Sequence, residues 1–204
     1  LPRLALAQSD SAWWAVVTSD DVYVRSAPSV ESSYPFLQVR TGDVVRVAEE
    51  SAGWARVLMQ GPTFKDAYGF VRADRRVTLA PDKRTAEVTA RTDVFAPNLS
   101  ARSSPDSSWK SIARIDPGRT VVVLESIEGQ RDTVYKVPMP PHAEGWINLA
   151  FLKRATDADL AKAGVTASDR APANTPGQTP GQTPAQAPTG ATSPAAPGAG
   201  TPGA

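Results

Sequence analysis

Short runs of alternating apolar and polar residues fill the stretch from residue 22 to residue 71. Turn residues such as Pro28, Gly42 and Gly53 separate the runs, which lie at 22–25, 44–47, 54–57 and 68–71. Successive side chains of an extended strand point to opposite faces, so this alternation predicts strands with one buried face. Several such strands with regularly spaced turns are typical of a small antiparallel barrel, and we expect an all-β fold.

The first predicted unit covers residues 16–82. Apolar side chains on one face of its strands form the expected core, which includes Val22, Val24, Ala55 and Val57. Alternation places Tyr23 and Trp54 on the opposite face. We expect a loop at 30–42, and we expect the strand at 68–72 to close this first barrel.

The same pattern returns between residues 88 and 154. Three of its segments, 120–124, 134–137 and 144–147, correspond in order to 44–47, 54–57 and 68–71. The matched segments keep separations of 76 to 80 residues, and such ordered correspondence indicates a second, divergent barrel. A β-domain of another kind is the alternative for this half of the chain.

Four segments taken in order resemble the bacterial SH3-like (SH3b) family: VYVRSAPS at 22–29, GDVV at 42–45, GWARV at 53–57 and YGFV at 68–71. The resemblance implies two small SH3-like β-barrels in tandem, each partly open. It also implies an exported protein, periplasmic or associated with the cell envelope, that binds cell-wall peptide, a peptide segment or a partner protein. The second unit lacks a counterpart of VYVRSAPS, and no catalytic domain accompanies the barrels in this sequence.

Both ends of the sequence differ in composition from the predicted barrels. Ala5 and Ala7 fit a small-residue cleavage site before Gln8, so we interpret residues 1–10 as a signal-peptide remnant and mature N-terminus. A frayed, alanine-rich N-terminus is the alternative. Residues 171–204 carry no charged side chain and repeat Thr-Pro-Gly-Gln. This composition buries no apolar surface and predicts a disordered tail, with an SH3 or WW ligand or an O-glycosylated stalk as alternatives.

A short helix is predicted in the linker 155–170. Thr156 can cap its N-terminus, and Asp157 and Asp159 favour its first turn. Gly164 can end the helix, because glycine readily adopts the left-handed conformation found after a helix.

Composition removes several classes of function. With a net charge of +1 and an isoelectric point near 8.2, the chain lacks the strong positive charge that attracts nucleic acid. The sequence has no cysteine and a single histidine, His142, so neither a thiolate nucleophile nor a typical zinc site is expected. No cofactor is predicted. The sequence contains no apolar run of the roughly 18 residues that a membrane span needs.

Carboxylates are the remaining candidates for catalysis. The pairs Asp20-Asp21 and Glu49-Glu50 are adjacent in sequence, so their side chains point to opposite faces of a strand and do not converge. His142 follows two prolines in a loop, where a solvated side chain is expected. We therefore expect no enzyme activity, with a carboxylate-only glycosidase as the catalytic alternative.

Aromatic side chains are the candidate ligand-binding groups. A groove floored by Trp54 would suit an extended peptide, because aromatic faces cover apolar stems while polar tips fix amide groups. The candidate residues are Tyr23, Tyr34, Trp54, Phe64 and Tyr68 in the first unit, and Tyr135 and Trp146 in the second. Alternatively, these aromatics complete small cores.

The predicted function is that of a non-catalytic exported module that binds cell-wall peptide or an extended peptide of a partner. The alternative is a structural adaptor of an envelope complex that uses its barrels for protein–protein packing.

Overall fold

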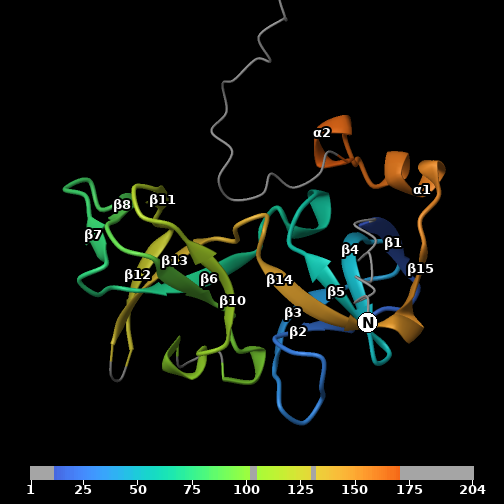
Figure 1. Cartoon of the computed structure of the whole chain (residues 1–204), viewed down its shortest axis with the longest axis horizontal. Helices are drawn as coiled ribbons and strands as arrows, with labels where there is room; N and C mark the ends of the chain where they lie inside the picture. The colour runs from blue at the N-terminus through green and yellow to red at the C-terminus, as the bar shows by residue number, and fades with distance from the viewer. Residues whose placement is uncertain (1–11, 102–104, 130–131, 171–204) are drawn as a thin grey trace, which may run out of the picture. The chain divides into compact units, whose positions relative to one another are not determined.

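The computed structural model describes residues 12–101, 105–129 and 132–170 (Figure 1). In this part of the chain, fifteen short strands outnumber two short helices and four 3-10 helices. Extended backbone dominates, which confirms the expected all-β fold. The predicted signal-peptide remnant at 1–10 and the predicted tail at 171–204 lie outside the described residues.

The strands form three antiparallel sheets. The first has the order β15 (Leu152–Arg154), β1 (Trp13–Val17), β4 (Val44–Ser51), β5 (Trp54–Leu58), β14 (Glu144–Asn148), β2 (Val22–Arg25) and β3 (Pro35–Val39). The second has the order β10 (Ser111–Ile115), β9 (Thr92–Phe95), β6 (Tyr68–Arg72), β13 (Thr133–Pro138) and β12 (Glu125–Glu128). The third has the order β11 (Thr120–Val122), β8 (Thr85–Val88) and β7 (Val77–Leu79). Each sheet is open, with an edge strand at either end.

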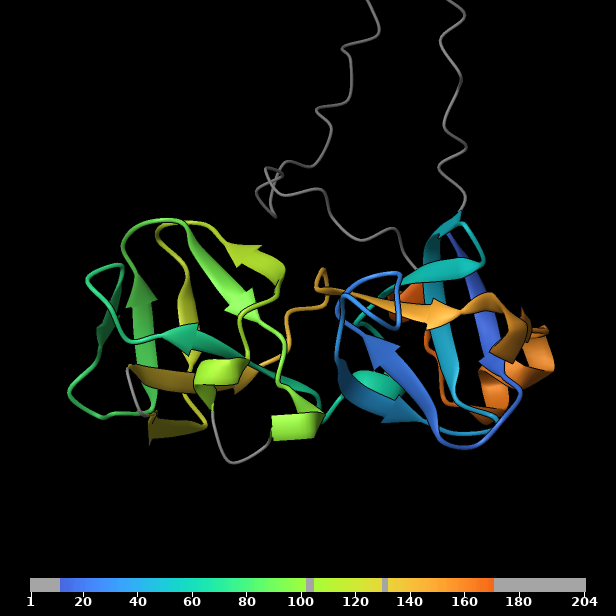
Figure 2. The ribbon, with the colours of Figure 1, turned by 90° about the horizontal axis from the view of Figure 1, so that it is seen from below.

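Two strands lie in sheets other than the predicted ones. The segment at 68–72, expected to close the first barrel, is β6 and pairs with β13 and β9 in the second sheet. Its predicted counterpart is β14, which pairs with β5 and β2 in the first sheet. Figure 2 shows β14 among the strands of the first sheet. Residues 68–138 are thus inserted between β5 and β14, and the strand pairing does not follow the predicted tandem division into 16–82 and 88–154.

Packing on the inner faces of β6 and β14 explains this exchange. Both strands have a glycine followed by an aromatic and a β-branched residue, so their patterns are equivalent. Alternation specifies which face is buried, but it does not specify which strand lies alongside. A Cβ added at Gly145 would collide with Val24 and Phe36, whereas one added at Gly69 would collide with Val94. Each glycine therefore fits its strand against a different set of neighbours.

One face of the first sheet encloses a core of its own. The predicted core residues Val22, Val24, Ala55 and Val57 are all buried, whereas Tyr23 is 46% exposed. Neighbouring strands contribute Val17, Phe36, Val39, Val45, Val47 and Ile147. The prediction of which side chains of the strands at 22–25 and 54–57 are buried is confirmed.

The second and third sheets share another core. Its buried residues come from strands of both sheets: Val71, Val94, Ile115, Tyr135 and Val137 from the second, and Val77, Ala86 and Val88 from the third. Strands of both sheets therefore bury their apolar side chains in one common core.

Two short connections join the insertion to the first sheet. The amide of Met59 donates to the carbonyl of Ala143 (2.8 Å), and the amide of Met139 donates to the carbonyl of Ala67 (2.9 Å). The outgoing and returning chains therefore run beside each other. Ala67, Met139 and Ala143 are buried in the first core, so both connections are packed.

The predicted helix after the second unit is confirmed as α1 (Asp157–Lys162). The Thr156 hydroxyl accepts from the amide of Asp159, and the Asp159 carboxylate accepts from the amide of Thr156, which forms a capping box. Gly164 follows with a φ of +75°. The next helix, α2 (Ala167–Arg170), is anchored at the Asp169 carbonyl by Gln60 (3.0 Å).

These helices cover part of the outer face of the first sheet. Leu160 and Val165 pack against Val16 of β1 and Val44 of β4. The outer face over β5, β14 and β2 carries half-buried and exposed side chains instead. The candidate site lies on this second part.

Candidate binding groove

Three side chains form a row across the outer face of the first sheet. Arg56 of β5 is the register partner of Trp146 of β14, and Trp146 is the register partner of Arg25 of β2. Directly opposed residues in antiparallel strands project from the same face. The Trp146 indole is therefore placed between two arginines, and all three residues are half-buried.

Arg56 fixes one side of this row. Its guanidinium forms ion pairs with Glu49 of β4 (3.0 Å) and with Glu144 of β14. The two carboxylates flank one cation, so three neighbouring strands are linked on their outer face. Glu144 is thereby held two residues from Trp146, on the same face of the same strand.

Arg25 fixes the other side by binding the loop that follows β2. Its Nε donates to the Ser29 carbonyl (3.2 Å) and the Ser33 hydroxyl (2.9 Å). Its Nη2 donates to the carbonyls of Val30 (2.9 Å) and Ser33 (3.0 Å). These bonds make Arg25 the residue that shapes the loop at 26–33.

A groove with a volume of about 420 Å³ runs between β14 and β10. Its lining residues come from both sheets and from the returning connection: Ser26, Ser111, Ile112, Ala113, Arg114, His142, Glu144 and Trp146. Trp146 and Ile112 supply apolar surface, and Ile112 is only 6% exposed because it also packs into the first core. The remaining side chains, apart from Ala113, are polar or charged.

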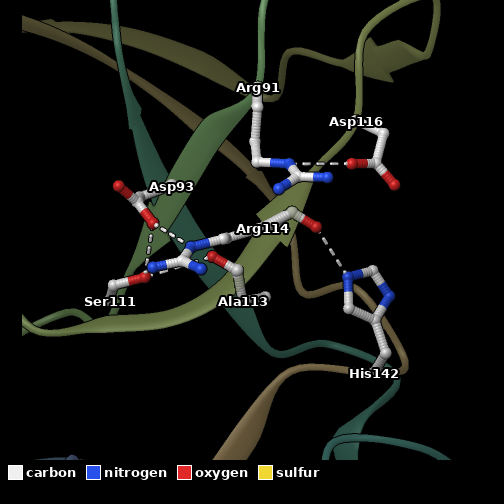
Figure 3. A network of polar contacts seen from close by, with 7 residues as sticks. All are labelled: Arg91, Asp93, Ser111, Ala113, Arg114, Asp116 and His142. Carbon is white, nitrogen blue, oxygen red and sulfur yellow. Dashed lines mark hydrogen bonds and ion pairs between the residues drawn. The ribbon is translucent and has the colours of Figure 1, made fainter. Parts of the chain in front are cut away.

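A polar network orders the β10 side of the groove (Figure 3). Asp93 of β9 accepts from the Ser111 hydroxyl (2.9 Å) and from Nε of Arg114 (3.2 Å). Nε2 of His142 lies 2.9 Å from the Arg114 carbonyl oxygen, and it donates in the tautomer that carries a proton there. Ser111 is thus bonded to Asp93 and not to His142. These residues do not form the nucleophile–base pair of a hydrolase.

Three of the seven predicted ligand-binding residues share the outer face of the first sheet. Trp146 lies in the groove itself. Trp54 is the register partner of Asn148 on the same strand pair, two positions along from Trp146. Tyr23 lies two positions from Arg25 on β2, so alternation puts it on this face as well. Trp54 and Tyr23 do not line the groove.

The other four predicted residues lie elsewhere, so Tyr34, Phe64 and Tyr68 do not edge a groove floored by Trp54. The Tyr34 hydroxyl donates to the Ala96 carbonyl (3.0 Å) and accepts from the Lys110 amide (3.1 Å). Burial raises the pKa of Tyr34, and the Lys110 amide opposes that rise. Tyr34 therefore joins the first sheet to the insertion.

Packing also accounts for Phe64, Tyr135 and Tyr68. Phe64 is buried in the first core, and Tyr135 is buried in the core shared by the second and third sheets. Tyr68 lies on β6, and its ring packs edge-on against the Phe70 ring with 5.7 Å between the ring centres. The Lys136 ammonium lies 4.3 Å from the centre of the Tyr68 ring. Alternation could not foresee these positions, because it gives the face of a side chain and not what covers that face.

Several groove residues were missed in the sequence. His142 was expected to be solvated, and it is exposed, but it also lies beside Arg114 at the groove. The β10 residues 111–114 carry no motif, and they lie 32 to 35 positions before Trp146. No sequence signal links these two segments, since their proximity follows from the return of the chain into the first sheet at β14.

Two further kinds of feature are absent from the described residues. No group of three or more His, Asp or Glu side chains there could hold a metal ion. None of the helices in that part of the chain is long and apolar enough to cross a membrane. Comparison of the chain with protein-family models, curated proteins and solved structures finds no match.

Proposed function

We propose that this protein is a non-catalytic binding protein that holds a peptide in the groove between β14 and β10. The peptide is either cell-wall peptide or an extended segment of a partner protein. The observation that carries the proposal is the groove itself, in which the Trp146 ring and the Ile112 side chain lie among hydrogen-bonding groups. Peptides present both apolar side chains and amide groups, and this lining offers partners for each.

The size and polarity of the groove support a peptide ligand. A volume of about 420 Å³ falls within the range of roughly 300–1,000 Å³ found for ligand sites. Glu144 accepts hydrogen bonds, Arg114 donates them, and the Ser26 hydroxyl can do either. The indole face of Trp146 can cover an aliphatic stem while its N–H bonds to a carbonyl.

The sequence resemblance adds the finer part of the proposal. We infer that the first sheet corresponds to one SH3b-like module, interrupted after β5 by residues 68–138. The 22–29, 42–45 and 53–57 segments of the resemblance all lie in or beside this sheet, whereas 68–71 lies in the insertion. An exported protein, in the periplasm or cell envelope, follows from the resemblance and from the Ala5–Ala7 pattern.

An adaptor role is the second candidate, and one observation favours it. Val122 and Leu124 are each more than half exposed, close to the edge strands β11 and β12. Exposed aliphatic side chains at a sheet edge are suited to a protein partner. In that case the insertion, and not the groove, would carry the interaction.

The test compares two tryptophan substitutions on the same face. Purified protein is sedimented with insoluble peptidoglycan, and it is titrated separately with a library of linear peptides. Trp146→Ala should weaken binding at least tenfold, whereas Trp54→Ala should bind like the wild type, because Trp54 does not line the groove. Equal binding by all three proteins, or no binding to either probe, would refute the proposal. Loss of binding only after Val122→Ser and Leu124→Ser would support the adaptor role.

A further inference from the structure

An unpaired strand edge borders the groove. β10 is the last strand of the second sheet, and it pairs with β9 on one side only. Four of the five β10 residues line the groove, at positions 111–114. The groove is therefore lined, on the side away from Trp146, by a strand that pairs with only one neighbour.

This edge differs from the other edge strands in the described part of the chain. β15, β7 and β11 have three residues each, and β12 has four. β3 equals β10 in length, but it begins at Pro35, which has no N–H to donate. Neither β3 nor the shorter edges contribute to the groove. Among these edges, β10 combines length with an adjoining apolar floor.

Local geometry sets the limits of the open edge. The register of β10 shifts between Ser111 and Ala113, and this irregularity turns Ile112 into the first core. The Ala113 carbonyl oxygen accepts from the Ser111 hydroxyl at 3.3 Å, and at the other end the Arg114 carbonyl oxygen is engaged by His142 at 2.9 Å. An added strand would therefore start near Ser111 and end at Arg114, a span of about 10–13 Å at the usual rise of roughly 3.3 Å per residue.

On the basis that the groove is the ligand site, we propose that its ligand is an extended segment of a partner protein that adds to β10 as a further strand. Main-chain hydrogen bonds to the β10 edge supply the attachment, and alternate side chains of the segment face Trp146. The Ser26 and Ser111 hydroxyls meet polar groups at the ends. Of the two ligand classes above, this selects the protein segment over cell-wall peptide.

Chirality separates the two classes physically. A strand that joins an L-sheet needs consecutive L-residues in the β region of backbone space. A D-residue has mirror-image preferences, so a peptide that contains D-residues, as cell-wall peptides do, interrupts the ladder. Each ladder bond that is lost costs binding affinity, because the donor or acceptor on β10 is left covered and unpaired.

The first experiment is a backbone-methylation scan. A binder is selected from a library of random linear L-heptapeptides, and each amide of the binder is N-methylated in turn. Strand addition predicts a loss of about tenfold or more at alternate positions and little loss at the positions between them. Its all-D enantiomer should not bind. A scan without this period of two, or binding by the all-D peptide, overturns strand addition even if binding still depends on Trp146.

The second experiment uses the unmodified protein. Saturating peptide should slow hydrogen exchange of those amides at 111–114 that point away from β9, because the amides of a strand alternate between its two sides. The edge strand β12 (Glu125–Glu128) serves as the internal control and should not change. Unchanged exchange at 111–114 overturns the inference. Binding of peptidoglycan with loss in Trp146→Ala, together with no binding of any L-peptide, leaves the groove proposal standing and overturns strand addition alone.

Discussion

Gly145 offers the sharpest test of the strand arrangement. An ideal Cβ at this position would lie 2.4 Å from Cγ1 of Val24, 2.8 Å from Cε of Met59 and 2.9 Å from Cζ of Phe36. These three side chains are almost fully buried, so they have little room to move. Gly145→Ala therefore places one methyl group into an occupied part of the first core.

The sign of the stability change distinguishes a crowded site from an open one. Gly145 does not have a positive φ, so its backbone conformation accepts alanine. In open space the substitution would stabilise the protein by about 0.4–1 kcal/mol, because it restricts the unfolded chain. Overpacking a close-packed core costs about 1–3 kcal/mol. The crowding outweighs the entropy gain, and we expect a net destabilisation of about 1–2 kcal/mol.

The assay is urea unfolding followed by tryptophan fluorescence and far-UV circular dichroism. A loss of about 1–2 kcal/mol corresponds to a fall in melting temperature of roughly 2–8 °C for a domain of this size. The double mutant Val24→Ala/Gly145→Ala provides the control, because removing the Val24 methyl groups makes space for the new one. Its stability should exceed the value expected from adding the two single effects.

Two results would refute this reasoning. One is a Gly145→Ala protein as stable as the wild type or more stable, and the other is strict additivity with Val24→Ala. Additivity would mean that β14 and β2 do not share a core. The pairing of β14 with β2 and β5 in the first sheet would then be wrong as well.

Three further predictions concern other parts of the chain. Arg25→Ala should destabilise the protein by roughly 1–2 kcal/mol and speed hydrogen exchange in the loop at 26–33, because its guanidinium holds that loop; unchanged exchange would contradict the role. The Arg76 guanidinium, hydrogen-bonded to Asp74, holds the pKa of that carboxyl below its ordinary value of 3.8. This stabilisation is present above pH 3.8 and is lost as the pH falls through the lowered pKa. Asp74→Asn should therefore reduce stability at neutral pH, and urea unfolding should show the deficit shrinking in acid; a deficit that does not depend on pH would argue against the ion pair. Thr156→Ala should destabilise α1 by about 1 kcal/mol, measured as faster hydrogen exchange of the α1 amides. Unchanged exchange would show that the Thr156 cap does not stabilise the helix.

Period-two alternation predicted the faces of strands well. It placed Val22, Val24, Ala55 and Val57 inside, and each is buried. This works because a half-buried strand forces apolar side chains to one side whichever strand lies next to it. The capping residues of α1 were equally predictable, since a helix end is satisfied by groups within a few positions.

Strand partners were not predictable in the same way. Tyr68-Gly69-Phe70 and Glu144-Gly145-Trp146 have the same spacing, yet the structure places them in different sheets. What distinguishes them is whether Val24 or Val94 occupies the space beside the glycine, and both neighbours lie far away in sequence. The groove was missed for the same reason, because β10 and Trp146 meet only after β14 has joined the first sheet.

The two hydrogen-bonded connections between the first sheet and residues 68–138 affect the order in which the parts of the chain fold. Arg56 and Glu144 are 88 positions apart, so β5 and β14 must close a very long loop if the intervening residues are unfolded. Once residues 68–138 have folded, Ala67 and Met139 are already held together, and the effective loop shrinks to roughly a dozen residues. This lowers the entropic cost of closure by about 1.5–2 kcal/mol. Formation of the insertion before the last strands of the first sheet is therefore the favoured order, and it would place the completion of the groove at the end of folding.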